Sequence, residues 1–301
     1  MDVELLKNKL LLVSAHESFV RFSNDQLMEY VDETNEFLQN HSDSLDNLEL
    51  FSLYQLQFYL NLLTMNDKQA KSALDTIVNQ FGADVDQSQR VRLLKSMYYE
   101  AMGDRTTAQE FLGKNANEMR LSRRLATFLR KNGDYVANLL FYLDLQPADI
   151  IAWGELAQQY HDLGHYDKAV FAYQEVLLHQ PFAYPIFYRI GLNYYYQFLQ
   201  LDKSKQDNKA KYVDAAELLT NARDNYLRAV EIFPGHAKAW LGINLLTKLP
   251  VNDKLAKLKL AKEYLDHNDK LRDISAAKLK QLAAADPALL QVIGSDTILK
   301  Q

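Results

Sequence analysis

The chain has 301 residues and a formal net charge of -5, so it lacks the strongly basic balance of a nucleic-acid-binding protein. Cysteine is absent, which excludes disulfides, thiolate metal sites and cysteine nucleophiles. Gly (10) and Pro (6) are scarce, and no stretch approaches the roughly 20 apolar residues of a membrane span. We therefore expect a soluble, all-α protein whose only route to a membrane is through partners.

Residues 1–47 are predicted to form a helical N-terminal cap. Two helices are expected, with a break at Ser23-Asn24-Asp25, where Ser23 is suited to cap the second helix. A terminal cap hides the open core of a repeat protein, so its sequence is expected to depart from the repeat pattern.

Degenerate helical repeats are predicted over residues 48–149. Small residues recur at uneven intervals, at positions where the two helices of a hairpin would approach most closely. The candidate inter-helix alanines of the whole chain are Ala70, Ala108, Ala137, Ala169 and Ala222.

The best-formed repeat is predicted at residues 150–183. Its marker residues, in order, are Trp153, Leu156, Ala157, Tyr160, Gly164, Tyr166, Ala169, Tyr173 and Pro181. Their order and spacing are those of the tetratricopeptide helix hairpin. Ala157 and Ala169 allow close helix contact, Gly164 supplies the turn, and Pro181 ends the second helix. The signature predicts an α-solenoid of such hairpins with helical caps at both ends.

The following repeat, residues 184–236, contains an insertion. Gly191 marks the first helix of this repeat and Ala222 marks the second, and 19 residues more than the regular spacing separate them. The extra residues include the charged run at 202–209, which predicts a solvated loop between two lengthened helices.

Residues 237–301 are predicted to hold the final repeat and the C-terminal cap. Trp240 opens this repeat, Pro250 breaks it, and a helix is expected near 253–267, followed by a last helix at 270–285. The chain is thus expected to form a single superhelical domain over residues 1–301.

Two groups of residues are candidates for a partner-binding groove, because the first helix of each tetratricopeptide hairpin lines the concave face. The first group is basic and is expected on one helical face: Arg120, Arg123, Arg130 and Lys131. An acidic partner segment and a merely solvated face explain this group equally well. The second group is an aromatic and aliphatic stripe, for which ordinary core packing is the alternative. Its members are Tyr188, Leu192, Tyr195, Tyr196, Leu241 and Leu245.

No constellation of catalytic residues stands out, and no cofactor-binding or metal site is predicted. The Gly-rich phosphate loop and the Gly-x-Ser-x-Gly elbow are both missing. His161 and His165 are four residues apart, but Gly164 lies between them at the repeat turn, so we expect them to point in different directions. We therefore predict a protein that is not an enzyme.

Beyond the single repeat, the order of motifs resembles a known family. The relevant motifs are Ala152-Trp153-x-Glu155-Leu156-Ala157, Tyr166-Asp167-Lys168-Ala169, Gln180-Pro181-Phe182-x-Tyr184 and Ser88-x-Arg90-Val91 with Leu94, Met97, Glu100 and Ala101. Together with the insertion before Ala222 and the run Tyr194-Tyr195-Tyr196, they resemble the fungal members of the family of subunit 2 of the ER membrane protein complex.

The resemblance implies a non-catalytic, peripheral subunit on the cytoplasmic face of the endoplasmic reticulum. It implies that the chain holds cytosolic segments of membrane subunits, notably subunits 3 and 5, in a complex that inserts tail-anchored and multipass membrane proteins.

The main alternative is a tetratricopeptide cochaperone or adaptor that clamps an acidic peptide tail. Arg123 fits one clamp position, but Thr127 stands where such a clamp has Asn. Ile151 and Glu155 stand where the next repeat supplies Lys and Arg. An acid at that point repels an acidic ligand, which disfavours the cochaperone.

Overall fold

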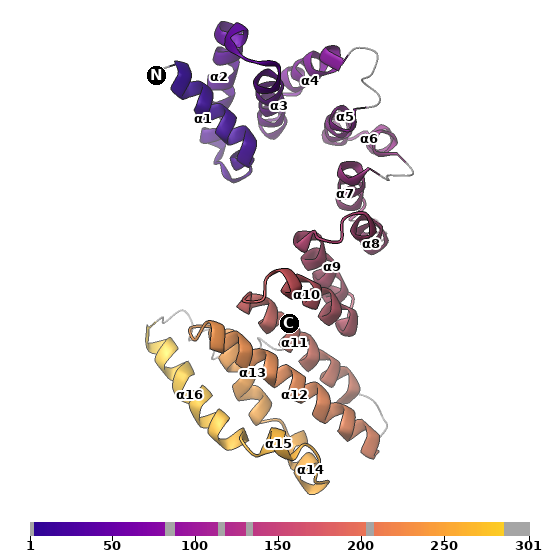
Figure 1. The fold of residues 1–301 in the computed structure, drawn as a ribbon, viewed down its shortest axis with the longest axis vertical. Coiled ribbons are helices and arrows are strands. Elements are labelled where there is room, and N and C mark those ends of the chain that lie inside the picture. The colour runs from indigo at the N-terminus through magenta and orange to yellow at the C-terminus, as the bar shows by residue number, and fades with distance from the viewer. Residues whose placement is uncertain (1–2, 82–87, 114–117, 131–134, 203–207, 286–301) are drawn as a thin grey trace. The chain divides into compact units, whose positions relative to one another are not determined.

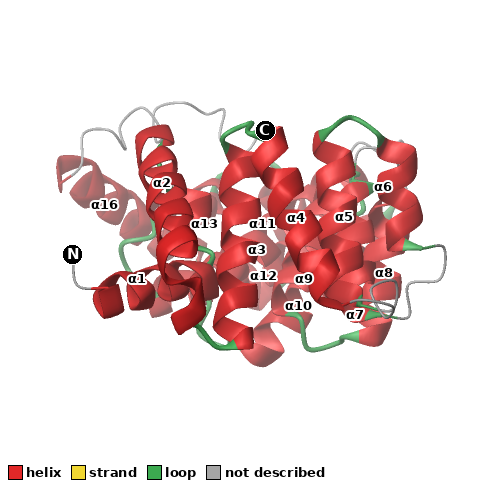
Figure 2. Cartoon of the chain, turned by 90° about the horizontal axis from the view of Figure 1, so that it is seen from above, coloured by secondary structure: helices red, strands yellow, loops and turns green. Residues whose placement is uncertain are grey.

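A computed structural model of the protein describes residues 3–81, 88–113, 118–130, 135–202 and 208–285. Every regular element in these ranges is a helix, as Figure 2 shows, and the prediction of an all-α fold is confirmed. The chain divides into two compact units, Met1–Leu145 and Gln146–Gln301, each of which is described by itself. That the two form one superhelical domain stays a prediction.

The N-terminal unit is a succession of helices joined by short connections (Figure 1). After the first two helices, consecutive helices pack as the hairpins α3–α4, α5–α6 and α7–α8. The elements are α1 (Val3–His16), η1 (Ser18–Arg21), α2 (Asn24–His41), η2 (Ser42–Ser44), α3 (Asn47–Leu63), α4 (Asp67–Phe81), α5 (Gln89–Ala101), α6 (Arg105–Leu112), α7 (Met119–Phe128) and α8 (Tyr135–Leu145).

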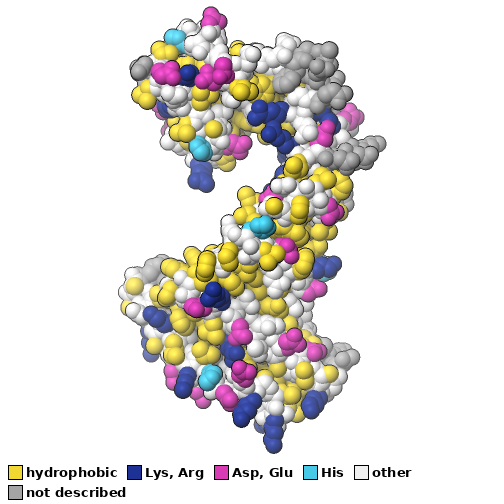
Figure 3. Space-filling view, in the orientation of Figure 1, with side chains coloured by type: hydrophobic (Ala, Val, Ile, Leu, Met, Phe, Trp, Pro, Cys, Tyr) yellow, Lys and Arg dark blue, Asp and Glu magenta, His cyan; other side chains and the backbone are white. Residues whose placement is uncertain are grey.

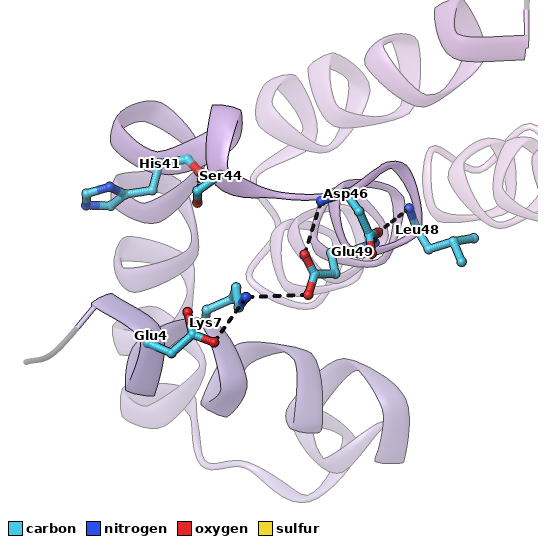
Figure 4. A network of polar contacts seen from close by, with 7 residues as sticks. All are labelled: Glu4, Lys7, His41, Ser44, Asp46, Leu48 and Glu49. Atoms are coloured by element: carbon cyan, nitrogen blue, oxygen red, sulfur yellow. Dashed lines mark hydrogen bonds and ion pairs between the residues drawn. The ribbon is translucent and has the colours of Figure 1, made fainter.

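The first helix of the cap is tied to the repeats by a charged contact. Lys7 Nζ lies 3.1 Å from Glu4 and 3.5 Å from Glu49, the latter on α3 (Figure 4). Glu49 also accepts a hydrogen bond from the backbone N–H of Asp46, whose own carboxylate caps α3. This reciprocal capping fixes where α3 begins.

Ser23 begins α2 as the sequence predicts. Its hydroxyl accepts a hydrogen bond from the backbone N–H of Gln26, and the Gln26 side chain accepts one from the backbone N–H of Ser23. Two backbone donors at the helix start are thereby satisfied.

The hairpins of the N-terminal unit confirm two of the predicted inter-helix alanines and correct a third. Ala70 and Ala108 are fully buried. Ala137 is exposed, because the buried face of α8 is made by Tyr135, Leu139 and other apolar residues in phase with them. With these residues on the buried face of α8 (Tyr135–Leu145), Ala137 faces outward.

The C-terminal unit contains eight helices in its described residues, and α9–α10 and α11–α12 form its clearest hairpins (Figure 1). The elements are α9 (Ile150–Asp162), α10 (Tyr166–His179), α11 (Tyr184–Asp202), α12 (Lys209–Ile232), α13 (Ala237–Thr247), α14 (Val251–Lys257), α15 (Lys262–Leu265) and α16 (Asn268–Ala285).

The α9–α10 hairpin has the contacts that its signature predicts. Ala157 and Ala169 are fully buried, and Tyr173 is nearly so. Gly164 adopts φ +78° between the two helices, a left-handed conformation that a residue with a Cβ rarely takes. The turn therefore depends on glycine.

Tyr226 of α12 occupies the centre of the C-terminal core and is fully buried. A Cβ on Gly191 of α11 would lie 2.8 Å from its ring, and one on Gly242 of α13 would lie 2.7 Å from it. Two glycines thus make room for one aromatic ring. The predicted loop of the insertion includes residues 203–207, which lie outside the described residues.

The expected single helix near residues 253–267 is wrong, because the chain forms the short helices α14 and α15 there. Lys259 and Ala261 between them have φ of 55° and 50°. This left-handed bend turns Tyr264 into the core, and the Tyr264 carbonyl accepts a hydrogen bond from Arg223. Burial of Tyr264 accounts for the break.

Candidate partner-binding surfaces

The predicted basic group begins on α7. Arg120 is exposed in the first turn of this helix. The guanidinium of Arg123, one turn further along, lies 5.6 Å from the ring centre of Tyr142 on α8 and is half-buried. Arg123 therefore holds α7 against α8 through a cation–π contact, whereas Arg120 presents its charge to solvent.

Arg130 does not continue the helical face expected for this group, because α7 ends at Phe128. Its guanidinium lies in the following turn, 5.4 Å from the ring centre of Tyr135. Lys131 lies outside the described residues. The structure therefore separates the basic group into one exposed helical arginine and two arginines that contact tyrosine rings.

A hollow close to these residues is mainly apolar, and all of its lining residues belong to the N-terminal unit. We call it the apolar hollow; it has a volume of about 530 Å³. Its walls come from η1 and the first helices of successive hairpins. The lining includes Val20, Tyr59, Leu62, Leu63, Met97 and Ala101. First helices are the ones that a tetratricopeptide protein uses to present its inner face.

The wall that η1 contributes is held in place by aromatic stacking. Phe19 stacks on Tyr59 of α3 with their ring centres 5.4 Å apart. Phe22 stacks on Tyr30 of α2 at 4.7 Å. Two aromatic pairs thus fix the segment that carries Val20 beside α3.

Glu100 and Arg124 are the polar pair within the apolar hollow. The Arg124 guanidinium of α7 donates a hydrogen bond to the Glu100 carboxylate of α5. A second guanidinium nitrogen of Arg124 donates to Thr127 at 3.3 Å. Arg124 Nε is buried without a hydrogen-bond partner, and apart from this pair and Glu17 the lining of the hollow is chiefly apolar.

The aromatic and aliphatic stripe of the C-terminal unit is largely packed against its own core. Tyr195 is only 8% exposed and belongs to the main hydrophobic cluster. Leu192, Leu241 and Leu245 are half-buried against the same cluster. Tyr188 lies 5.8 Å from Tyr226, measured between ring centres. Most of the stripe therefore stabilises the fold.

Tyr196 differs from the rest of the stripe. Its ring stacks on Tyr166 at 5.1 Å and lies edge-on to His161 at 5.4 Å. His161 Nδ1 is 2.9 Å from the Asn193 side-chain oxygen on α11. The half-buried ring of Tyr196 and its neighbours form a small aromatic surface where α9, α10 and α11 meet.

Burial shifts the pKa of several residues in this unit. It raises the pKa of Tyr188 and of Tyr196 above the ordinary value of 10, at which a phenol is already neutral at physiological pH. Burial also lowers the pKa of His236, with a further lowering from the charge of Lys238.

His161 and His165 occupy different surroundings, as the repeat turn predicts. His161 contacts Asn193, whereas His165 precedes α10 and lies edge-on to Tyr160. Within the described ranges, no cluster of three or more His, Asp or Glu side chains has the geometry to hold a metal ion. None of the helices in those ranges combines the length and apolarity of a membrane span.

The hairpins, the glycine turn and the buried small residues define a tetratricopeptide-type repeat protein. Residues 74–201 match the family described as the EMC2 TPR-like repeat domain. ER membrane protein complex subunit 2 of Saccharomyces cerevisiae is 23% identical over 297 residues, which cover 93% of each chain. The resemblance drawn from the sequence is confirmed, because the matching family model and this yeast relative are both those of subunit 2 of the ER membrane protein complex.

Two further proteins are similar to the chain. The TPR repeat protein oca3 of Schizosaccharomyces pombe is 26% identical over 232 residues, which cover 75% of each chain. Among solved structures, MamA from Desulfovibrio magneticus is similar with a TM-score of 0.42 and 16% identity, over 66% of this chain and 96% of that one.

The sequence did not point to the apolar hollow. Phe19 and Val20 belong to the N-terminal cap, which has no repeat pattern, and Leu63 lies in a degenerate repeat. The one available signal was Val20 between Phe19 and Phe22, just before the break predicted at Ser23-Asn24-Asp25. The hollow depends on contacts between segments about 40 residues apart, which spacing alone does not reveal.

Proposed function

We propose that this chain is a non-catalytic scaffold subunit of the ER membrane protein complex. It holds cytosolic segments of the membrane subunits, with subunits 3 and 5 as its principal partners. Through them it sits as a peripheral subunit on the cytoplasmic face of the endoplasmic reticulum. In this role it supports the insertion of tail-anchored and multipass membrane proteins.

The observation that carries the proposal is similarity to the yeast subunit over 93% of both chains. The structure supports it in two ways. The first helices of the N-terminal hairpins leave an apolar hollow open, and Arg120 presents an exposed charge on the third of them. Concave surfaces of repeat proteins are where such proteins bind their partners.

The test is recovery of partners from membranes. A tagged full chain is expressed in yeast cells, the membranes are solubilised in mild detergent, and the co-purified proteins are identified by mass spectrometry. We expect the membrane subunits of the complex in near-equal amounts with the bait. Recovery of chaperones without those subunits would overturn the proposal and favour the cochaperone alternative.

A further inference from the structure

We propose that residues 286–301 of this chain bind an apolar groove between α12 and α13 of the same molecule and so cover the end of the last repeat. The inference goes beyond the proposed function and does not depend on it. It concerns the C-terminal unit alone.

The groove is formed by α12, the connection that follows it and the first turn of α13. We call it the terminal groove; it has a volume of about 570 Å³. It is lined by the apolar residues Leu227, Val230, Pro234 and Trp240 and by the charged residues Asp224, Arg228 and Glu231. Arg228 forms an ion pair with Glu231 at 2.7 Å, and Asp224 forms one with Arg223 at 3.1 Å. Pro234 is exposed and Leu227 is half-buried, so the groove offers apolar surface to a ligand.

Hydrogen bonds fix the direction in which α16 packs on α13. Asn244 Nδ2 donates to the Ser275 hydroxyl at 2.9 Å and to the Arg272 carbonyl at 3.3 Å. The Tyr264 hydroxyl, just before α16, donates to the Leu246 carbonyl at 3.4 Å. Later residues of the chain therefore pair with earlier residues of α13, and α16 runs antiparallel to α13.

The described part of α16 ends beside the terminal groove. Ala285 lies about 15 Å beyond Ser275 along the helix axis. Trp240 lies about 6 Å before Asn244 on the same face of α13. With about 10 Å between the axes of packed helices, Ala285 is roughly 13 Å from Trp240. Figure 1 agrees, because the last turns of α12 and α16 lie at the same end of the unit.

The sequence after Ala285 supplies apolar side chains at this distance. Residues 286–301 lie outside the described residues, and Pro287 disfavours a helical conformation for Asp286 before it. Four extended residues span about 13 Å, so the chain can reach Trp240 at Leu289. The large apolar residues from there are Leu289, Leu290, Val292 and Ile293. Such side chains gain free energy when the groove covers them.

Covalent attachment favours this segment over a separate partner. A segment joined by a linker of a few residues is present at the groove at an effective concentration on the order of millimolar. The last unit of a repeat protein also has to cover its open end. Figure 3 shows hydrophobic side chains at the surface of the C-terminal unit, with charged side chains among them. The chain's own C-terminal segment is the occupant that both arguments select.

The first experiment uses the absence of cysteine from the chain. Glu231→Cys in the groove and Leu289→Cys in the segment introduce two thiols, and a disulfide between them requires Cα atoms within about 7 Å. The control pairs Leu289→Cys with Lys238→Cys. Lys238 is exposed and lies two residues before Trp240, on the other side of α13. Oxidised glutathione is the oxidant, and non-reducing gel electrophoresis separates the products.

We expect the pair with Glu231→Cys to form an intramolecular disulfide at least about fivefold faster than the pair with Lys238→Cys, because the bound segment lies against α12. The same comparison with Leu290→Cys and with Ile293→Cys covers the neighbouring positions of the segment. Equal rates at all three positions would overturn the inference. A disulfide-linked dimer as the main product would place the segment on a second copy and would also overturn it.

The second experiment measures competition for the groove. The probe is a fluorescein-labelled peptide with the sequence of residues 286–301, and fluorescence anisotropy gives its dissociation constant. One receptor is the full chain with Leu289→Ser and Ile293→Ser, whose own segment has lost two apolar side chains. The wild type and a matched control, Gln291→Ser with Thr297→Ser, are the other receptors.

We expect the peptide to bind the Leu289→Ser, Ile293→Ser chain at least about tenfold more tightly than the wild type or the control, since only there is the groove free. Every chain should keep the wild-type circular dichroism spectrum. Equal binding to all three chains, or binding to none of them, would contradict an intramolecular contact through these apolar residues.

Discussion

The inner faces of the two units use their aromatic residues in opposite ways. In the N-terminal unit, Phe19 stacks on Tyr59 and holds a wall of the apolar hollow, which leaves Val20 and Leu63 uncovered. In the C-terminal unit, Tyr195 and Tyr226 are buried in the hydrophobic core. An aromatic stripe in a repeat sequence is therefore weak evidence of a binding groove, because the same residues serve packing equally well.

The largest expected effect concerns the filled core. Tyr226→Ala should lower the free energy of unfolding by about 3–5 kcal/mol, because it removes a fully buried ring that two glycines accommodate. Urea denaturation followed by circular dichroism measures the change. Tyr226→Phe keeps the ring and is the control. A loss below about 1 kcal/mol for Tyr226→Ala would show that this core is loosely packed.

The next effect separates two neighbouring tyrosines of the predicted stripe. Tyr195→Ala should lower the free energy of unfolding by about 3 kcal/mol, because the side chain is buried. Tyr196→Ala should lower it by about 1 kcal/mol, because that side chain is only half-buried. Thermal unfolding of the two variants side by side checks the difference. Equal losses would mean that the stripe is not divided into a core residue and a surface residue.

A smaller effect tests the start of the N-terminal unit. Ser23→Ala should destabilise the protein by about 1 kcal/mol, because it leaves backbone donors of α2 without their cap. Ser72→Ala, at an exposed serine within α4, is the control and should change stability by a few tenths of a kcal/mol. An equal loss of stability in the two variants would show that the Ser23 cap does not stabilise α2.

The smallest expected effect is a pH dependence of stability that arises from His236 in the C-terminal unit. His236 Nδ1 accepts a hydrogen bond from the backbone N–H of Ala239 at 3.1 Å, and burial lowers the pKa of His236 from its ordinary value of 6.5. The unfolded chain therefore binds this proton more readily than the folded one. The contribution of neutral His236 to the free energy of unfolding is therefore fully present above pH 6.5. It is lost as the pH falls through the lowered pKa.

The measurement for His236 is the melting temperature at neutral and at mildly acidic pH. The wild type should lose more stability on acidification than His236→Asn, since Asn caps a helix without titrating in this range. Equal losses in both proteins would assign the pH dependence to other groups.

The hairpins could be predicted from the sequence, but which of their side chains are buried and which stay exposed could not. Ala157, Gly164 and Ala169 mark a repeat because each solves a local steric problem, and such problems leave a fixed spacing. Burial of Tyr195 depends on the rotation of α11 against α12, and spacing does not determine that rotation. Ala137 was wrongly predicted to be buried for a related reason, because the buried face of α8 is the one that carries Tyr135 and Leu139.

The most direct test of the account compares three versions of the full chain in the membrane pull-down. The wild type and a control, Leu178→Glu at a 74% exposed leucine of the C-terminal unit, should recover the membrane subunits of the ER membrane protein complex equally. Leu63→Glu combined with Arg120→Glu should recover them several-fold less while keeping the wild-type circular dichroism spectrum. Equal recovery by all three would contradict the claim that the open inner face of the N-terminal unit holds a partner.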